Sequence, residues 1–160
     1  MMKTNLKVTD MTTFDFGDGK GRVAAHQHSN GGGWVADTAK VAKTAYVGPD
    51  ARVYGDALVF GDAHVSRNAH VFGNAWVSDN AWVSDEAWVS GDALVSGTAR
   101  VTGAAQVYGN AHVSGYAQVY GTARVSDNAW VYGDAEVFGD AWVSGNAHVS
   151  GVERVDADMR

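Results

Sequence analysis

Residues 57–74 read ALVFGDAHVSRNAHVFGN, which is three copies of a six-residue unit with alanine first and valine third. The same spacing places a valine at every sixth position from Val35 to Val155 without exception. An alanine lies two residues before each valine from Ala39 to Ala147. So strict a period predicts one small structural unit stacked many times, with no inserted loop inside the array.

Each unit is predicted to be a short strand followed by a corner. Alanine and valine are two residues apart, so they point to one side of an extended chain, while the residues beside them point to the other. The corner usually begins with Gly, as at Gly61, or with Asp, as at Asp79, and both residues tolerate positive φ. Lys43 and Arg67 occupy this position as exceptions, and we expect them to mark corners of a different shape.

Over about residues 35–155 this pattern resembles the hexapeptide-repeat family, and within it the YdcK-like Ala-x-Val-x-Gly solenoids of bacteria and phages. The resemblance implies an all-β fold, a left-handed parallel β-helix with three sides, about 18 residues per coil and between six and seven coils. Valine and alanine then fill the interior, which excludes a ligand cavity there. Function must therefore lie on the outward positions or outside the array.

Three parts of the chain are predicted. Residues 1–33 form an N-terminal cap or irregular segment, 34–155 form the solenoid and 156–160 form a charged C-terminal tail that caps the other end. Phe14, Phe16 and a turn at Gly17-Asp18-Gly19 favour a small hairpin within the first part. Such covers are needed because the open ends of a solenoid invite end-to-end stacking.

Composition narrows the class of protein. The 160 residues suit one domain, and the net charge of −6 without a basic patch argues against a nucleic-acid partner. Cysteine is absent, which excludes disulfides and thiolate metal sites. The first residues lack an apolar signal core and no stretch reaches transmembrane length, so we expect a cytoplasmic protein without a membrane partner, although a virion component would look the same.

One of the three predicted outer faces is the most apolar. Its candidate oligomer-interface residues are Leu58, Phe60, Trp76, Leu94, Trp130 and Tyr132. A contiguous apolar patch usually marks an association surface. Because the family commonly packs three prisms side by side, the resemblance implies a homotrimer. The alternative is that these aromatic side chains only stack in ladders on a solvated wall.

A second candidate site precedes the array, where the sequence does not repeat. Its candidate ligand-binding residues are His26, His28, Gly31, Gly32, Gly33 and Trp34. On a strand the two imidazoles would share one side and could chelate a metal or meet a phosphate, and the glycines allow close backbone approach. The alternative interpretation is a flexible join that leads the cap into the first coil.

The family also includes acyltransferases and γ-type carbonic anhydrases, so catalysis must be considered. The uninterrupted repeat leaves no room for protruding catalytic loops, and the four array histidines, His64, His70, His112 and His148, do not converge on one metal. We therefore predict no catalytic residue, metal or cofactor. The leading hypothesis is a non-catalytic, homo-oligomeric binding or structural module, in one version a phage-encoded protein that sequesters a small nucleotide or sugar-like ligand. The alternative is an acyltransferase-like enzyme with its site between subunits.

Overall fold

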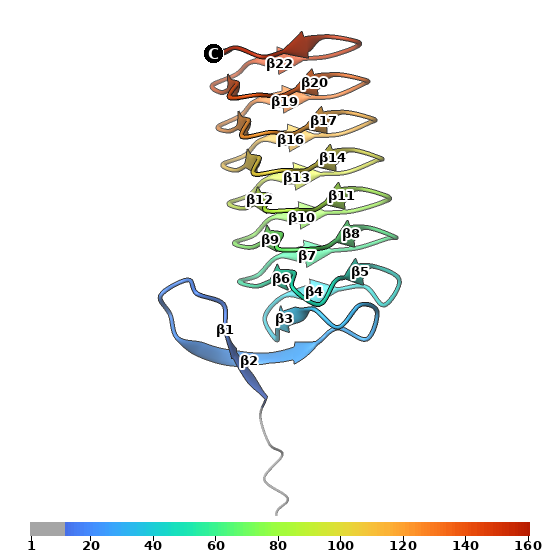
Figure 1. Ribbon diagram of the computed structural model, residues 1–160, viewed down its shortest axis with the longest axis vertical. Helices are drawn as coiled ribbons and strands as arrows, with labels where there is room; N and C mark the ends of the chain where they lie inside the picture. The colour runs from blue at the N-terminus through green and yellow to red at the C-terminus, as the bar shows by residue number, and fades with distance from the viewer. Residues whose placement is uncertain (1–11) are drawn as a thin grey trace, which may run out of the picture.

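The computed structural model describes residues 12–160, which form a column of stacked coils with a hairpin at its N-terminal end (Figure 1). Residues 1–11, on which the prediction about a signal core partly rests, lie outside the described part. Within residues 12–160 there is no helix that is long and apolar enough to cross a membrane.

The array strands lie in three parallel sheets, with successive strands assigned in turn to each sheet. Sheet I contains β1 (Thr13–Asp15), β2 (Arg22–Gln27), β3 (Trp34–Ala36), β6 (Arg52–Val53), β9 (His70–Val71), β12 (Trp88–Val89), β15 (Gln106–Val107), β18 (Arg124–Val125) and β21 (Trp142–Val143). Sheet II contains β4 (Lys40–Val41), β7 (Leu58–Val59), β10 (Trp76–Val77), β13 (Leu94–Val95), β16 (His112–Val113), β19 (Trp130–Val131) and β22 (His148–Val149). Sheet III contains β5 (Tyr46–Val47), β8 (His64–Val65), β11 (Trp82–Val83), β14 (Arg100–Val101), β17 (Gln118–Val119), β20 (Glu136–Val137) and β23 (Arg154–Val155).

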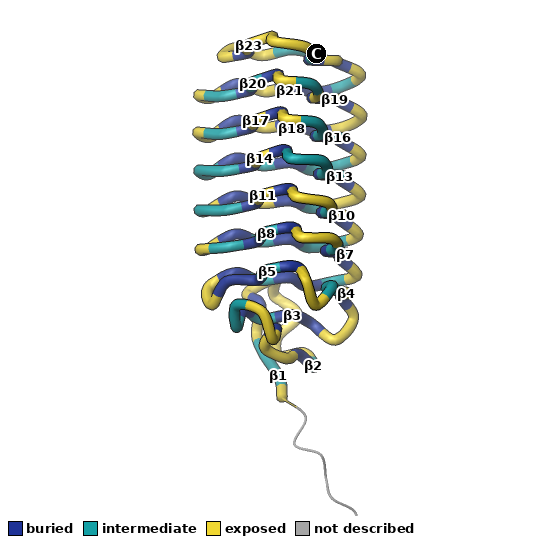
Figure 2. Tube along the Cα trace, turned by 90° about the vertical axis from the view of Figure 1, so that its right-hand side faces the viewer, coloured by how far each residue is buried: buried dark blue, intermediate teal, exposed yellow. Residues whose placement is uncertain are grey.

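Each coil is 18 residues long, because every strand pairs in parallel with the strand three places later, as Trp76 does with Leu94. The prediction of a three-sheet, all-β solenoid is confirmed, and the array has seven coils. Valine and alanine point inward and form one continuous core in which nearly every member is fully buried. Figure 2 shows the alternation of buried strand positions and exposed corners along the column.

From Gly55 onward the corners have one recurring backbone conformation, with positive φ at their first residue. Arg67 has a φ of 56°, similar to the 65° of Asp85 in the next coil, so the prediction that it marks a different corner is wrong. Lys43 is not among the positive-φ residues, as expected. Where Asp replaces Gly, its carboxylate accepts the corner N–H of the next coil, as Asp79 does from Gly97 at 3.0 Å. This hydrogen bond offsets the strain of a non-glycine residue in the left-handed region.

The residues before the array cover its first coil. β1 and β2 form an antiparallel hairpin, and β2 pairs antiparallel with β3, so the hairpin extends sheet I. Between β2 and β3 the chain crosses the edge of sheet III. There Val47 donates its N–H to the Asn30 carbonyl at 3.0 Å, and its own carbonyl accepts the Gly33 N–H at 2.9 Å.

The C-terminal tail lies over β21 at the opposite end. Met159 forms a parallel bridge with Val143, and its backbone N–H donates to the Trp142 carbonyl at 2.8 Å. Its side chain packs against the interior core. The tail therefore continues the stacking of sheet I and covers part of the last coil.

Candidate functional site

Outward side chains form ladders, because each coil places the same position of the repeat directly above the previous one. One coil carries Trp76, Trp82 and Trp88, one on each sheet, with exposed fractions of 43%, 44% and 45%. Every face of the column therefore has at least one aromatic contact point.

The four array histidines are each stacked on a tryptophan of a neighbouring coil. The ring centroids are 4.6 Å apart for His64 and Trp82, 5.4 Å for His70 and Trp88, 4.5 Å for His112 and Trp130, and 5.8 Å for Trp130 and His148. Near-parallel stacking of this kind stabilises the ladder. Within residues 12–160 no three metal-ligating side chains of His, Cys, Asp or Glu converge on one point.

Sheet II differs from the other two sheets in charge. From β7 to β22 its outward positions carry no Asp, Glu, Lys or Arg; they are Leu58, Phe60, Trp76, Ser78, Leu94, Ser96, His112, Ser114, Trp130, Tyr132, His148 and Ser150. We call this surface the uncharged face. It includes all six residues predicted for an oligomer interface, of which Trp76, Trp130 and Tyr132 are the most exposed, at 43%, 43% and 38%.

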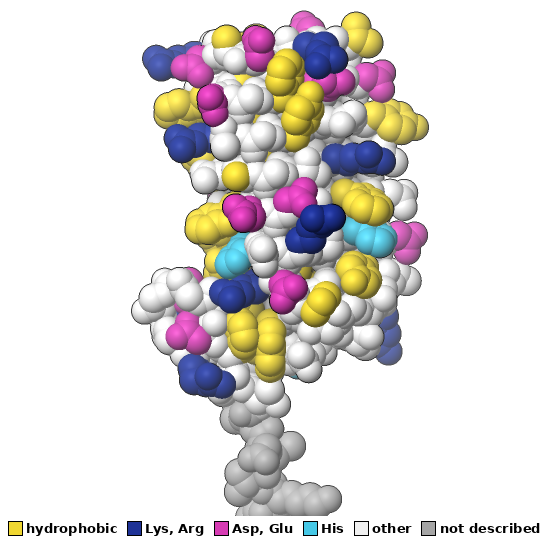
Figure 3. Space-filling view, viewed as in Figure 1, with side chains coloured by type: hydrophobic (Ala, Val, Ile, Leu, Met, Phe, Trp, Pro, Cys, Tyr) yellow, Lys and Arg dark blue, Asp and Glu magenta, His cyan; other side chains and the backbone are white. Residues whose placement is uncertain are grey.

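The other two sheets carry charges at the same positions. On sheet III, Arg154 pairs with Glu136 at 3.2 Å, and Arg100 lies over the Trp82 ring at 5.9 Å. Sheet I carries Arg52 and Arg124. On the side of the column seen in Figure 3, basic and acidic side chains alternate with hydrophobic ones along its height. The uncharged face is therefore an exception on this molecule.

The residues of the predicted ligand-binding segment contact different parts of the protein and do not form one site. His26 contacts the Asp37 carboxylate at 2.8 Å, whereas His28 is buried and contacts the Ala45 carbonyl oxygen at 2.9 Å. The two imidazoles therefore bind separate partners. Trp34 stacks on Phe14 at 4.5 Å, on the outer side of sheet I.

The three glycines of this segment allow it to cross the first coil closely. A Cβ atom at Gly31 would lie 2.2 Å from the Val47 carbonyl oxygen, and one at Gly33 would lie 2.2 Å from the Gly48 carbonyl oxygen. Gly32 has open space around it. The close backbone approach that these glycines allow is therefore to the first coil itself.

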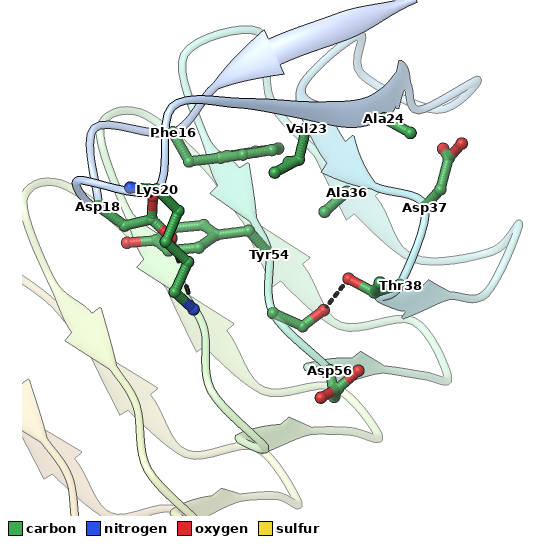
Figure 4. Close-up of a pocket in the computed structure, with 11 residues that line it drawn as sticks. Phe16, Asp18, Lys20, Val23, Ala24, Ala36, Asp37, Thr38, Tyr54 and Asp56 are labelled. Carbon is green, nitrogen blue, oxygen red and sulfur yellow. Dashed lines mark hydrogen bonds and ion pairs between the residues drawn. The ribbon is translucent and has the colours of Figure 1, made fainter. Parts of the chain in front are cut away.

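A cavity of about 300 Å³ lies between the hairpin and the first coils, and the sequence did not indicate it. Its apolar side chains are Phe16, Val23, Ala24, Ala36 and Tyr54. In Figure 4, Asp18 and Lys20 approach it from the hairpin, while Asp37, Thr38 and Asp56 lie on the opposite side. We call this site the cap cavity. It depends on how the hairpin folds back onto sheet I, which the repeat pattern does not specify.

The hairpin is held in place by an aromatic stack and one guanidinium group. Phe16 stacks on Tyr54 at 4.9 Å, and Tyr54 stacks on Phe72 at 4.9 Å. Arg52 donates to the Phe16 carbonyl at 3.1 Å and lies over the Phe14 ring at 5.4 Å. Because these contacts are made outside the prism, they define a second small core next to the cap cavity.

Burial within this second core and beside it shifts the pKa values of two side chains, Tyr54 and His70. The pKa of Tyr54 is raised, first by burial and then by the nearby Asp18 carboxylate, while Arg52 acts in the opposite direction. The pKa of His70 is lowered, first by burial and then by the positive charge of Arg52. The Tyr54 hydroxyl and His70 Nδ1 are 3.3 Å apart, so the two groups share a polar contact at the border between cap and array.

The geometry defines a class of protein: a loop-free, three-sided β-solenoid repeat protein with one uncharged face and an N-terminal cap. The YdcK β-solenoid repeat family matches residues 51–67, 105–121 and 117–133. The structure continues the same unit through all seven coils, so the chain is a β-solenoid repeat protein whose repeat units are similar to those of the YdcK family. No curated protein and no solved structure matches the chain.

Proposed function

We propose that this protein is a non-catalytic, homo-oligomeric β-solenoid that serves as a rigid structural or binding module and assembles through the uncharged face. The observation that carries the proposal is the lack of formal charge on sheet II from β7 to β22, when both other sheets carry charged side chains at equivalent positions. Charged residues are depleted at the centres of protein interfaces, where aromatic residues are enriched. The exposed Trp76 and Trp130 fit that composition.

The size of the face supports a ring of copies over a pair. The six strands from β7 to β22, at about 4.8 Å spacing, give a height of about 29 Å, and four extended residues give a width of roughly 13 Å. This projected area of about 400 Å² is half of the roughly 800 Å² per partner that is typical of stable complexes. In a closed ring of three, each copy contacts two neighbours, one through the uncharged face and one through a second patch, so each copy buries more area than it would in a pair joined by that face alone. Three copies is also the number that the family resemblance implies.

A structural or binding role is supported by the shape of the column. Between Val35 and Val155 no residue is inserted, so the outward side chains lie on flat sheets and tight corners. Catalytic groups generally need a concave, partly desolvated site. Such a scaffold presents regularly spaced side chains without needing to move, which suits recognition or assembly.

The test is native mass spectrometry, together with light scattering after size-exclusion chromatography. We expect the wild-type protein at three times the 16.9 kDa chain mass. Trp76→Glu places a charge on the uncharged face and is expected to give monomers. Trp88→Glu is the matched control, because Trp88 has the same exposure in the same coil but lies on sheet I. A monomeric wild-type protein, or equal dissociation by both variants, would contradict the proposal.

A further inference from the structure

We propose that the cap cavity binds a small organic cation, with an ammonium or guanidinium group carried on an apolar or aromatic body. The cavity is a distinct site from the uncharged face, and the inference does not depend on self-assembly. It starts from the shape and chemistry of the space between the hairpin and the first coils (Figure 4).

The interior of the cavity is apolar. Phe16, Ala36 and Tyr54 are buried, and Val23 and Ala24 complete the wall from β2. At about 300 Å³ the cavity is at the small end of the range for ligand sites. It therefore suits a compact body of the size of one aromatic ring with a short chain.

The rim of the cavity is acidic. It has three carboxylates, those of Asp18, Asp37 and Asp56, and one ammonium group, that of Lys20. Lys20 and Asp18 lie 3.9 Å apart and partly compensate each other. The remaining charge is negative, so the rim favours a cation over a neutral molecule and disfavours an anion.

The unused hydrogen-bonding capacity of the rim consists mainly of acceptors. The Thr38 hydroxyl already donates to the Gly55 carbonyl oxygen, and the Tyr54 hydroxyl already contacts His70. Asp37 uses one carboxylate oxygen for His26, which leaves its other oxygen for a ligand. Within residues 12–160 the Asp56 side chain forms no ion pair or hydrogen bond. A ligand that satisfies these acceptors must bring hydrogen-bond donors, and an ammonium or guanidinium group brings several N–H donors together with a positive charge.

The two sides of the cavity are fixed by different parts of the chain. Asp18 is held in the hairpin turn between Gly17 and Gly19, both with positive φ, and its Oδ1 accepts the Lys20 N–H at 3.1 Å. Asp56 is the second residue of a regular corner, whose N–H donates to the Gly73 carbonyl oxygen at 2.9 Å. The cavity is therefore largely preformed, which reduces the entropic cost of binding.

The experiment is a titration of the full chain followed by amide chemical shifts, with 2-phenylethylammonium as the probe. We expect saturable shifts at Thr38, Gly55 and Asp56, and weaker binding at raised salt concentration. 2-Phenylethanol, which has the same body without the charge, and 3-phenylpropionate, which is an anion, are expected to bind at least about fivefold more weakly.

Asp56→Asn is expected to weaken the binding of 2-phenylethylammonium by about fivefold, the upper end of the effect of an exposed ion pair. Asp62→Asn is the matched control: it removes the same charge from the next corner along the chain, which does not line the cavity, and should leave binding unchanged. Both side chains are exposed, so both variants should keep the wild-type melting temperature. The proposal is overturned if no saturable shifts occur at the cavity, if the alcohol binds as tightly as the amine, or if both variants weaken binding equally.

Discussion

The array and the N-terminal cap both cover apolar side chains, but they do so in different ways. In the array, valine and alanine point into a closed prism, and each coil repeats the contacts of the coil before it. In the cap, Phe16 and Tyr54 pack outside the prism, on the outer side of sheet I, and no contact is repeated. The same sheet therefore has a periodic core on one side and a unique core on the other.

This difference determines how substitutions act in the two regions. A position in the array has the same role in every coil, so its substitutions should have effects set by burial and by corner geometry. A position in the cap has a role that depends on one particular neighbour. The cap is also the place where a hollow with apolar walls arises, whereas the hollow on the stacked coils around Arg67 and Asp85 is lined by charged and polar side chains.

The largest effect is expected where the periodic core is broken at its centre. Val101→Asp would place a carboxylate at a fully buried position in the fourth coil, without a partner, and is expected to lower the free energy of unfolding by about 4 kcal/mol or more. Val23→Asp, at a position in β2 that is 37% exposed, should change it by less than about 0.5 kcal/mol. Denaturant titration followed by circular dichroism measures both. Comparable losses would show that the array core is less closed than its burial indicates.

The next effect concerns the crossing that joins the cap to the first coil. Gly31→Ala should cost about 2–3 kcal/mol, because its φ is 116° and its Cβ would lie 2.2 Å from the Val47 carbonyl oxygen. Gly32→Ala has a φ of 80° but meets nothing within 4 Å, so only backbone strain of about 1 kcal/mol is expected. Thermal unfolding gives the loss, and hydrogen exchange at the Gly33 and Val47 amides locates it. Similar costs for the two variants would mean that the close approach is not what selects glycine.

A smaller effect distinguishes two replacements at one corner of the array. Gly97→Ala should cost about 1 kcal/mol, since φ is 68° and the new Cβ would lie 3.0 Å from the Gly115 N and O atoms. Gly97→Asp should cost less, because its carboxylate can accept the Gly115 N–H, as Asp79 and Asp127 do for the corners that follow them. The difference in melting temperature between the two variants measures this compensation. If the aspartate variant is as unstable as the alanine variant, the hydrogen bond from the carboxylate does not explain why Asp occurs at these corners.

The sequence alone predicted the array well, because the spacing of Val and Ala determines which side chains point inward and how strands stack. It also placed the six candidate interface residues on one sheet, since a period of 18 residues sorts them directly. It failed at Arg67, which adopts the positive φ of the regular corners and stacks below Asp85, although arginine has no intrinsic preference for that conformation.

The cap cavity could not be predicted in the same way. Its walls join residues from 16 to 56 through tertiary packing of one hairpin, and no periodic signal encodes that contact. Gly17 and Gly19 indicated a turn, but not which side of sheet I the turn would face. Similarly, the glycines from 31 to 33 indicated close approach, while the object approached, the Val47 and Gly48 carbonyls, depended on the structure.

The smallest effect is a pH dependence at the border of the two regions, carried by His70. Its imidazole faces Tyr54 and Arg52 on one side and Trp88 on the other, and its pKa is lowered by burial and by Arg52. The folded protein thus binds this proton less readily than the unfolded chain. Stability from this residue is complete above the unfolded pKa of about 6.5 and is lost as the pH falls through the lower folded pKa. His70→Gln should therefore reduce the drop in melting temperature between pH 7 and pH 5. His112→Gln is the control, because it leaves the Tyr54–His70 contact intact and should keep the contribution of His70 to that drop. If His70→Gln leaves the drop in melting temperature unchanged, burial near the cap does not affect the titration of His70 in β9. The border between the cap core and the array then lies at Tyr54.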